Sequence, residues 1–219
     1  MDEADYAAME MERMGKWVVD DLDDLHYIAE IDSKINYLTI KIDVDDPIYL
    51  QRAATAKHVK IIGPNVHNID YLDELKGAEN LEISKTAITR LRGLEKMPVL
   101  KDVGIYQNSS LSDLGEIMES QSIETIAITG SNISPFPVID MPIVHSFGYG
   151  RSGTTIDTKE FLLHLHTSRL HALNLSGNNI SKINGFELHP NIKYLGLKDN
   201  RITAIENFEP LSHLIELDL

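Results

Sequence analysis

Residues 170–190 read LHALNLSGNNISKINGFELHP, and residues 191–210, NIKYLGLKDNRITAIENFEP, follow without a break. The two stretches carry the same skeleton of apolar residues 22 positions apart, and this repetition decides the fold. The first copy has Leu170, Leu173, Leu175, Asn178, Ile180 and Ile183, and the second has Ile192, Leu195, Leu197, Asn200, Ile202 and Ile205. A segment this short cannot bury its apolar face alone, so stacked copies must share one core.

Weaker copies of the skeleton run back through the chain. The residues at the position of Leu173 are, in order, Leu38, Val59, Leu81, Val103, Ile126, Phe147, Leu173, Leu195 and Leu217. Each is followed two positions later by a second apolar or aromatic residue, which is typical of a short strand with both side chains on one face. We expect about nine repeats over residues 35–219, the last incomplete and one enlarged at about residues 144–169.

This skeleton resembles that of the leucine-rich-repeat superfamily in its 22-residue form, similar to the repeats of phosphatase-regulatory and internalin-type proteins. Two repeats fit that pattern closely and keep its turn asparagine, as Asn178 and Asn200; among the others only Asn108 keeps it, in a repeat with irregular downstream spacing. The resemblance implies an α/β solenoid, a right-handed arc with a parallel β-sheet on its concave face and a helical cap at the N-terminus. It also implies a scaffold or regulatory role.

Residues 1–34 are expected to form that acidic N-terminal helical cap. Met14, Val18, Leu22, Leu25 and Ala29 follow one another at helical spacing and would make one apolar stripe. The aspartates at positions 20, 21, 23 and 24 occupy much of the remaining surface. They indicate either a solvated helix face or a docking surface for a basic partner.

Composition restricts the function. The chain has 34 acidic and 20 basic residues and a net charge of −14, which disfavours binding to nucleic acid or to an anionic membrane surface. It has no cysteine, so disulfides, thiolate zinc sites and cysteine nucleophiles are excluded. The N-terminal residues lack the basic flank and apolar core of a signal peptide, and a cytoplasmic location is expected.

The segment FGYGRSGTT, residues 147–155, has the glycine spacing of a dinucleotide-binding loop. Such a loop requires a helix that begins at the glycines, whereas the best helix start here is Asp157 or Thr158. We therefore interpret the segment as strand and turn of the enlarged repeat. Phe147 and Tyr149 then point inward, and Gly148 lies on the concave face.

No catalytic or metal-binding set is evident in the sequence. His164 and His166 are two residues apart on an expected helix, so they cannot easily share a metal ion, and we expect His164, His166 and His171 to be polar surface residues. No Ser/His/Asp arrangement is indicated by spacing. We expect a protein that is not an enzyme and has no metal site and no cofactor.

The concave face is the expected binding surface. Its central column reads Thr39, Lys60, Glu82, Gly104, Ala127, Gly148, Asn174, Gly196 and Asp218, which is nearly bare in the middle. The candidate partner-binding residues beside it are Lys101, Tyr106, His145, Arg151, His171, Lys193, Tyr194 and Lys198. Tyrosine and arginine often dominate binding energy at protein interfaces.

The sequence thus predicts a protein-protein interaction scaffold that binds another protein, through an acidic or extended segment, on its concave face. Two alternatives stay open: a targeting domain of a larger enzyme whose catalytic part lies beyond Leu219, and a small-ligand sensor. Because Leu219 falls within a strand pattern, we also expect further repeats or self-association to cover that edge.

Overall fold

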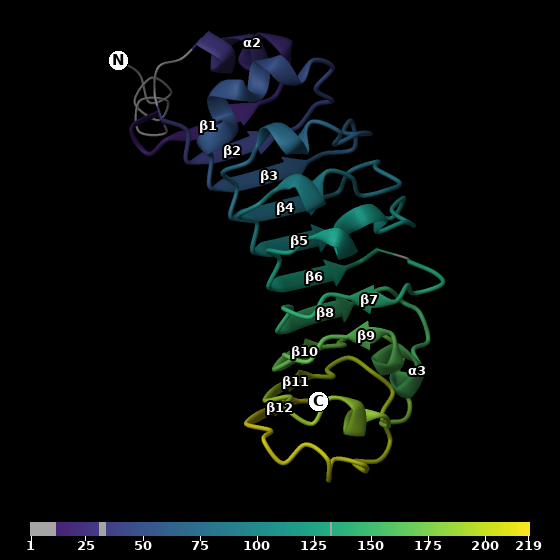
Figure 1. The fold of residues 1–219 in the computed structure, drawn as a ribbon. Coiled ribbons are helices and arrows are strands. Elements are labelled where there is room, and N and C mark those ends of the chain that lie inside the picture. The colour runs from purple at the N-terminus through teal and green to yellow at the C-terminus, as the bar shows by residue number, and fades with distance from the viewer. Residues whose placement is uncertain (1–11, 31–33, 132) are drawn as a thin grey trace.

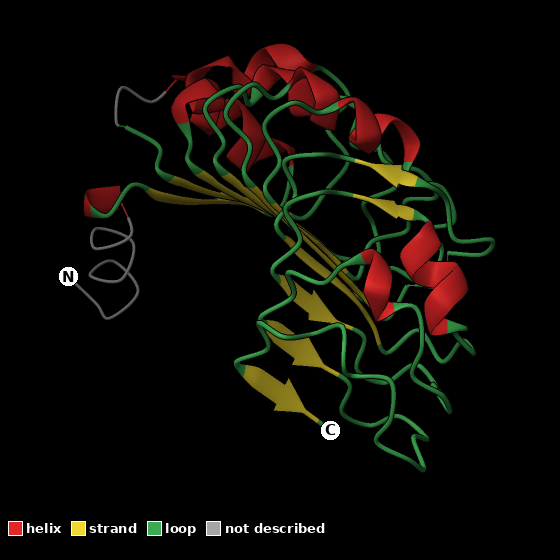
Figure 2. Ribbon diagram, turned by 60° about the horizontal axis from the view of Figure 1, so that its bottom comes forward, coloured by secondary structure: helices red, strands yellow, loops and turns green. Residues whose placement is uncertain are grey.

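The computed structural model is an arc built on one parallel sheet, and it describes residues 12–30, 34–131 and 133–219. Ten strands pair in the order β1-β2-β3-β4-β5-β6-β8-β10-β11-β12. They stack one above the next along the molecule, and the helical segments lie on the outer side of the arc (Figures 1 and 2). This arrangement confirms the predicted solenoid.

The strands of this sheet are short. They are β1 Lys16–Val19, β2 Tyr37–Ile40, β3 His58–Ile62, β4 Asn80–Ser84, β5 Asp102–Tyr106, β6 Thr125–Thr129, β8 Ser146–Gly150, β10 Ala172–Asn174, β11 Tyr194–Gly196 and β12 Glu216–Asp218. The outer segments are helix α2, Leu22–Glu30, helix α3, Thr158–Leu163, and the 3-10 helices η1 Pro47–Thr55, η2 Leu72–Glu74, η3 Leu94–Lys96, η4 Gly115–Glu119 and η5 Phe186–Leu188.

The repeat register is the one that the sequence predicts. The nine residues at the position of Leu173 all lie in strands, and each is the pairing partner of the next, from Leu38 with Val59 to Leu195 with Leu217. Eight of them, Leu38 to Leu195, are at most 3% exposed. Their side chains and those two positions later form the core between the sheet and the outer segments.

The N-terminal cap is not confirmed as a helix, and the single stripe from Met14 to Ala29 is wrong. Gly15 has a φ of +63°, and its carbonyl oxygen accepts the backbone N–H groups of Asn36 and Tyr37. Residues Lys16–Val19 then pair with β2 as a tenth strand. The positive φ and the exchange of helical for inter-strand hydrogen bonds end any helix at this point. Residues 1–11 and 31–33 of the predicted cap lie outside the described residues.

The exposure of the stripe agrees with this correction. Met14 is 44% and Leu22 is 53% exposed, whereas Leu25 and Ile28 of α2 are buried. Helix α2 packs against η1 and lies between β1 and β2, as η1 lies between β2 and β3. It is therefore the outer segment of a first repeat that the sequence did not reveal.

The enlarged repeat contains a second, two-stranded sheet. Strands β7, Ile139–Asp140, and β9, Leu165–His166, pair in parallel on the outer side, next to α3 (Figure 1). The helix begins where the sequence predicts, because the carboxylate of Asp157 accepts the backbone N–H of Glu160 at 3.0 Å. It ends at Leu163, before His164 and His166, which were expected to lie on it, because Leu165 and His166 form β9.

Polar side chains inside the turns hold successive repeats together. Asn178 donates to the carbonyl oxygens of Tyr149 and Leu175, and its own oxygen accepts the hydroxyl of Ser152 at 2.7 Å. Asn200 accepts the backbone N–H groups of Asn178 and Ile180 at 3.0 and 2.9 Å. These bonds satisfy backbone groups that the bends would otherwise leave unpaired.

Candidate functional site

The concave column of small residues is confirmed by the register, but only part of its floor is open. Gly148 pairs with Ala127 and Asn174, and a Cβ added there would meet no heavy atom closer than 3.7 Å. At Gly104 the added atom would lie 2.5 Å from the hydroxyl oxygen of Tyr106, whose ring covers the glycine. The amide of Asn174 covers Gly196 in the same way, at 3.0 Å.

Two grooves follow from this arrangement. The C-terminal groove, with a volume of about 650 Å³, runs over β6, β8, β10, β11 and β12. The N-terminal groove, of about 380 Å³, runs over strands β2 to β6. The open floor at Gly148 belongs to the C-terminal groove.

The eight predicted residues are not brought together into one site. Arg151, Tyr194 and Lys198 line the C-terminal groove, and Tyr106 lines the N-terminal groove. The other four line neither groove, because each lies one residue before the start of a strand. They are Lys101, His145, His171 and Lys193. They lie along the edge of the sheet where the strands begin. There the backbone N–H of His171 donates to the carbonyl oxygen of His145, and the N–H of Lys193 donates to the carbonyl oxygen of His171.

The polar lining of the C-terminal groove was predicted only in part. Asn174 and Asp218 belong to the predicted central column, whereas Thr129, Ser146, Ser176 and Glu216 were not predicted. The strand alternation that located the central column also places the residues two positions before and after it on the concave face. Applying it to the flanking columns would have found the hydroxyl groups and Glu216.

Charges near the N-terminal groove are paired within the molecule. Lys60 contacts Glu82 at 2.8 Å, and Lys57 contacts Glu79 at 2.7 Å. The amine of Lys16 lies 5.4 Å from the ring centre of Tyr37, which stacks on His58. Burial and the nearby Glu82 raise the pKa of Tyr106, so its hydroxyl stays protonated at neutral pH.

The cations of the C-terminal groove are not paired. Among the described residues, neither Arg151 nor Lys198 has a carboxylate oxygen within 4.0 Å. The backbone of Arg151 has a φ of +50°, and its side chain lies beside Gly177 of the next repeat. These cations are therefore available to an external anionic group.

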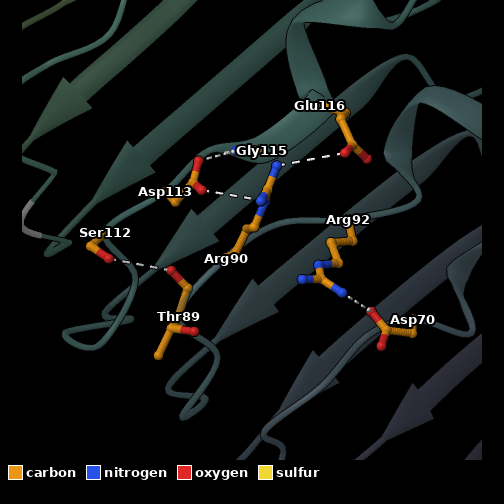
Figure 3. A network of polar contacts seen from close by, with 8 residues as sticks. All are labelled: Asp70, Thr89, Arg90, Arg92, Ser112, Asp113, Gly115 and Glu116. Carbon is orange, nitrogen blue, oxygen red and sulfur yellow. Dashed lines mark hydrogen bonds and ion pairs between the residues drawn. The ribbon is translucent and has the colours of Figure 1, made fainter.

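Two arginines outside the grooves, Arg90 and Arg92, show the opposite arrangement. In the segments between strands and 3-10 helices, Arg90 contacts Asp113 at 3.3 Å and Glu116 at 3.5 Å, and Arg92 contacts Asp70 at 3.8 Å (Figure 3). Asp113 also accepts the backbone N–H of Gly115 at 2.7 Å. The paired arginines connect neighbouring repeats, which distinguishes them from Arg151.

The glycine segment is strand and turn, as predicted. Gly148 is the middle residue of β8, and Phe147 and Tyr149 are buried at 1% and 2% exposure. Helix α3 begins beyond Asp157, so its first amides do not meet the glycines. The fold therefore does not place a dinucleotide loop here.

The three histidines considered as metal ligands have different surroundings. His164 bonds through Nδ1 to the carbonyl oxygen of Phe136 at 3.0 Å, whereas His166 and His171 are exposed. Within the described ranges, no group of three His, Asp or Glu side chains is arranged to hold a metal ion. No helix in that part of the chain has the length and apolar character needed to cross a membrane.

Comparison with known proteins identifies the fold. No protein-family model and no curated protein matches the sequence. Among solved structures, TLR13 in complex with ssRNA13 aligns with a TM-score of 0.70 and 16% identity, over 94% of this chain and 31% of that chain. The chain thus spans less than a third of the TLR13 chain.

Two further structures have a more similar length. An internalin, inlF of Listeria monocytogenes, aligns with a TM-score of 0.55 and 16% identity, over 90% of this chain and 68% of its own. The leucine-rich repeat domain of APL1B aligns with a TM-score of 0.57 and 14% identity, over 100% and 73%. This protein has the leucine-rich-repeat fold.

Proposed function

We propose that the protein is a non-enzymatic recognition module that binds another protein in the C-terminal groove of its concave face. The observation that carries the proposal is the open floor at Gly148 beside the unpaired cations Arg151 and Lys198. A floor without side chains lets a partner backbone approach the sheet closely. The unpaired cations would then meet an acidic group of that partner.

The exposed tyrosine at the groove supports this proposal. Tyr194 is 46% exposed although it lies on a strand, and it stands beside Gly196. Exposed tyrosine and arginine side chains commonly supply the largest single contributions to a protein interface. Tyr194 and Arg151 are the residues of this kind that line the C-terminal groove.

The charge of the protein favours a protein partner over a nucleic acid. The structure of TLR13 is of a complex with RNA, so a protein of this fold can bind nucleic acid. Here the net charge is −14, and Glu216 and Asp218 line the same groove as the two cations. Repeated phosphate groups would be repelled by this mixture, whereas a protein segment with both signs of charge would fit it.

The test is a comparative capture experiment. A triple variant of the C-terminal groove, Arg151→Ala, Tyr194→Ala and Lys198→Ala, is used to retain proteins from the native lysate beside the unchanged protein. We expect the variant not to retain the true partner, because truncation of each important interface residue costs about 2 kcal/mol of binding free energy. Circular dichroism and thermal unfolding establish that the variant is folded.

A matched control carries three alanines on the outer side of the arc. Tyr27, Arg92 and Leu188 are also exposed there, and replacing them should leave capture unchanged. If the concave variant and the control retain the same proteins as the unchanged chain, the C-terminal groove is not the binding surface.

A further inference from the structure

The enlarged repeat holds a pocket that the concave face does not explain. It lies between the loop at Ile133 to Phe136, the segment at Thr154 to Asp157 and the first turns of α3. Its volume is about 220 Å³. We call it the side pocket. At ~30 Å³ for each water molecule, it has room for about seven waters or a small organic molecule.

The base of the side pocket is aromatic. Phe136 lies 5.0 Å from Tyr149 and 4.5 Å from Phe161, measured between ring centres. Tyr149 and Phe161 are buried, and the hydroxyl of Tyr149 is already bonded to the carbonyl oxygen of Ile133 at 3.3 Å. Ile133 and Ile156 complete the apolar part of the lining. This base offers a ligand apolar contact and no hydroxyl donor from Tyr149.

The rim of the side pocket is acidic. Asp157 and Glu160 both line it, and the described residues of its lining include no lysine or arginine. One oxygen of Asp157 caps α3 by accepting the backbone N–H of Glu160, which leaves the second oxygen outside that bond. His164 also lines the pocket, and its Nδ1 is engaged by the carbonyl oxygen of Phe136. The charge at the mouth thus favours a cation.

We propose that the side pocket binds a small primary amine with an aromatic body. The ring of the ligand would pack on Phe136 and the isoleucines, and its ammonium group would lie between Asp157 and Glu160. Anionic ligands are disfavoured by the two carboxylates, and the volume limits the enclosed part of a ligand to about the size of one aromatic ring with a short chain. Of the described residues that line the side pocket, only Tyr149 also lines the C-terminal groove, and the proposal does not depend on the function proposed for the concave face.

Three probes of similar shape test this proposal on the full chain: 2-phenylethylamine, 2-phenylethanol and 3-phenylpropanoate. Methyl NMR signals of Ile133 and Ile156 report on the pocket itself. We expect saturable shifts with the amine at micromolar to millimolar concentration, weaker binding of the alcohol, and none of the carboxylate. Equal affinity for amine and alcohol, or no shift with the amine, would overturn the proposal.

A double variant, Asp157→Asn with Glu160→Gln, tests the role of the carboxylates. Asparagine can still cap the helix, so the variant should fold. We expect about a tenfold loss of amine affinity, the effect of two exposed ion pairs, with alcohol binding unchanged. The control is Glu187→Gln, a change at an exposed residue of η5, and this variant should bind the amine normally.

The outcome is independent of the concave face. The double variant should capture the same protein partner as the unchanged chain, and the concave triple variant should bind the amine normally. An unchanged amine affinity in the double variant would show that the carboxylates do not form the site.

Discussion

Asn178 is fully buried, and each of its polar atoms has a partner in a neighbouring backbone or side chain. Replacing it by alanine leaves the carbonyl oxygens of Tyr149 and Leu175 without these bonds. We expect Asn178→Ala to lower the free energy of unfolding by about 3 kcal/mol, measured by urea denaturation. Asn191 is exposed, and Asn191→Ala should change it by less than about 0.5 kcal/mol. Equal effects of the two substitutions would contradict a structural role for the turn asparagine.

Two glycines of the FGYGRSGTT segment are expected to differ although they are two residues apart. A Cβ at Gly148 would make only ordinary van der Waals contacts, at 3.7 Å or more, whereas one at Gly150 would lie 2.8 Å from the backbone oxygen of Ser176. We expect Gly150→Ala to lower the free energy of unfolding by about 2 kcal/mol and Gly148→Ala to change it by less than about 0.5 kcal/mol. Thermal unfolding of the two variants side by side makes the comparison. Similar melting temperatures would show that the strand end is not tightly packed.

At the scale of elements, a histidine joins two outer segments of neighbouring repeats. Nε2 of His189, directly after η5, bonds to the carbonyl oxygen of Leu162 in α3 at 3.1 Å. Burial lowers the pKa of His189 below 6.5; the bond to Leu162 opposes this shift, and nearby His166 adds to it slightly. The folded state therefore resists protonation more than the unfolded state does.

The pH dependence follows from that direction. Stability linked to His189 is present above the unfolded pKa of about 6.5 and is lost as the pH falls below it. We expect the free energy of unfolding to decrease from about pH 7.5 to about pH 5.5, and less so in His189→Gln. Urea denaturation at the two pH values measures the difference, with His213→Gln, on an exposed histidine, as the control. If both variants retain the full decrease, other groups are responsible.

Most elements of the sheet could be predicted because each strand repeats the same inward pair. The pattern located the strands from β2 to β12 that form the main sheet, including β8 with aromatic residues in place of leucines. It missed β1, since Trp17 and Val19 of that strand lie among residues that also fit a helical stripe. The choice between helix and strand depends there on pairing with β2, which local spacing does not contain.

The candidate site was less predictable than the sheet. The column of small residues was found, but which glycines are covered depends on the rotamers of Tyr106 and Asn174. The side pocket arises from packing between segments around Phe136 and Phe161, 25 positions apart in the sequence. Neither feature follows from periodicity, because both depend on contacts between side chains of different repeats.

At the scale of the whole molecule, each repeat is stabilised by its neighbours, so stability should vary along the arc. Leu195 of β11 is 2% exposed, whereas Ile205 and Ile215 near the last strand are 70% and 69% exposed. In this chain of 219 residues we expect amides of β4 to β6 to exchange on the order of 100-fold more slowly than those of β11 and β12. Hydrogen exchange with mass spectrometry measures this, and uniform protection would indicate one cooperative unit.

The parallel register of β10 and β11, with a constant offset of 22 residues, also makes the arc extensible. A duplicated copy of residues 170–191 placed between them would present the same inward leucines and the same turn asparagine to both neighbours. The faces of the copy would match those that β10 and β11 present to each other, so the molecule would lengthen by one strand spacing of about 4.8 Å without a new kind of contact. The C-terminal groove would become longer by the same distance, and the number of inserted copies would set the length of partner that it could contact.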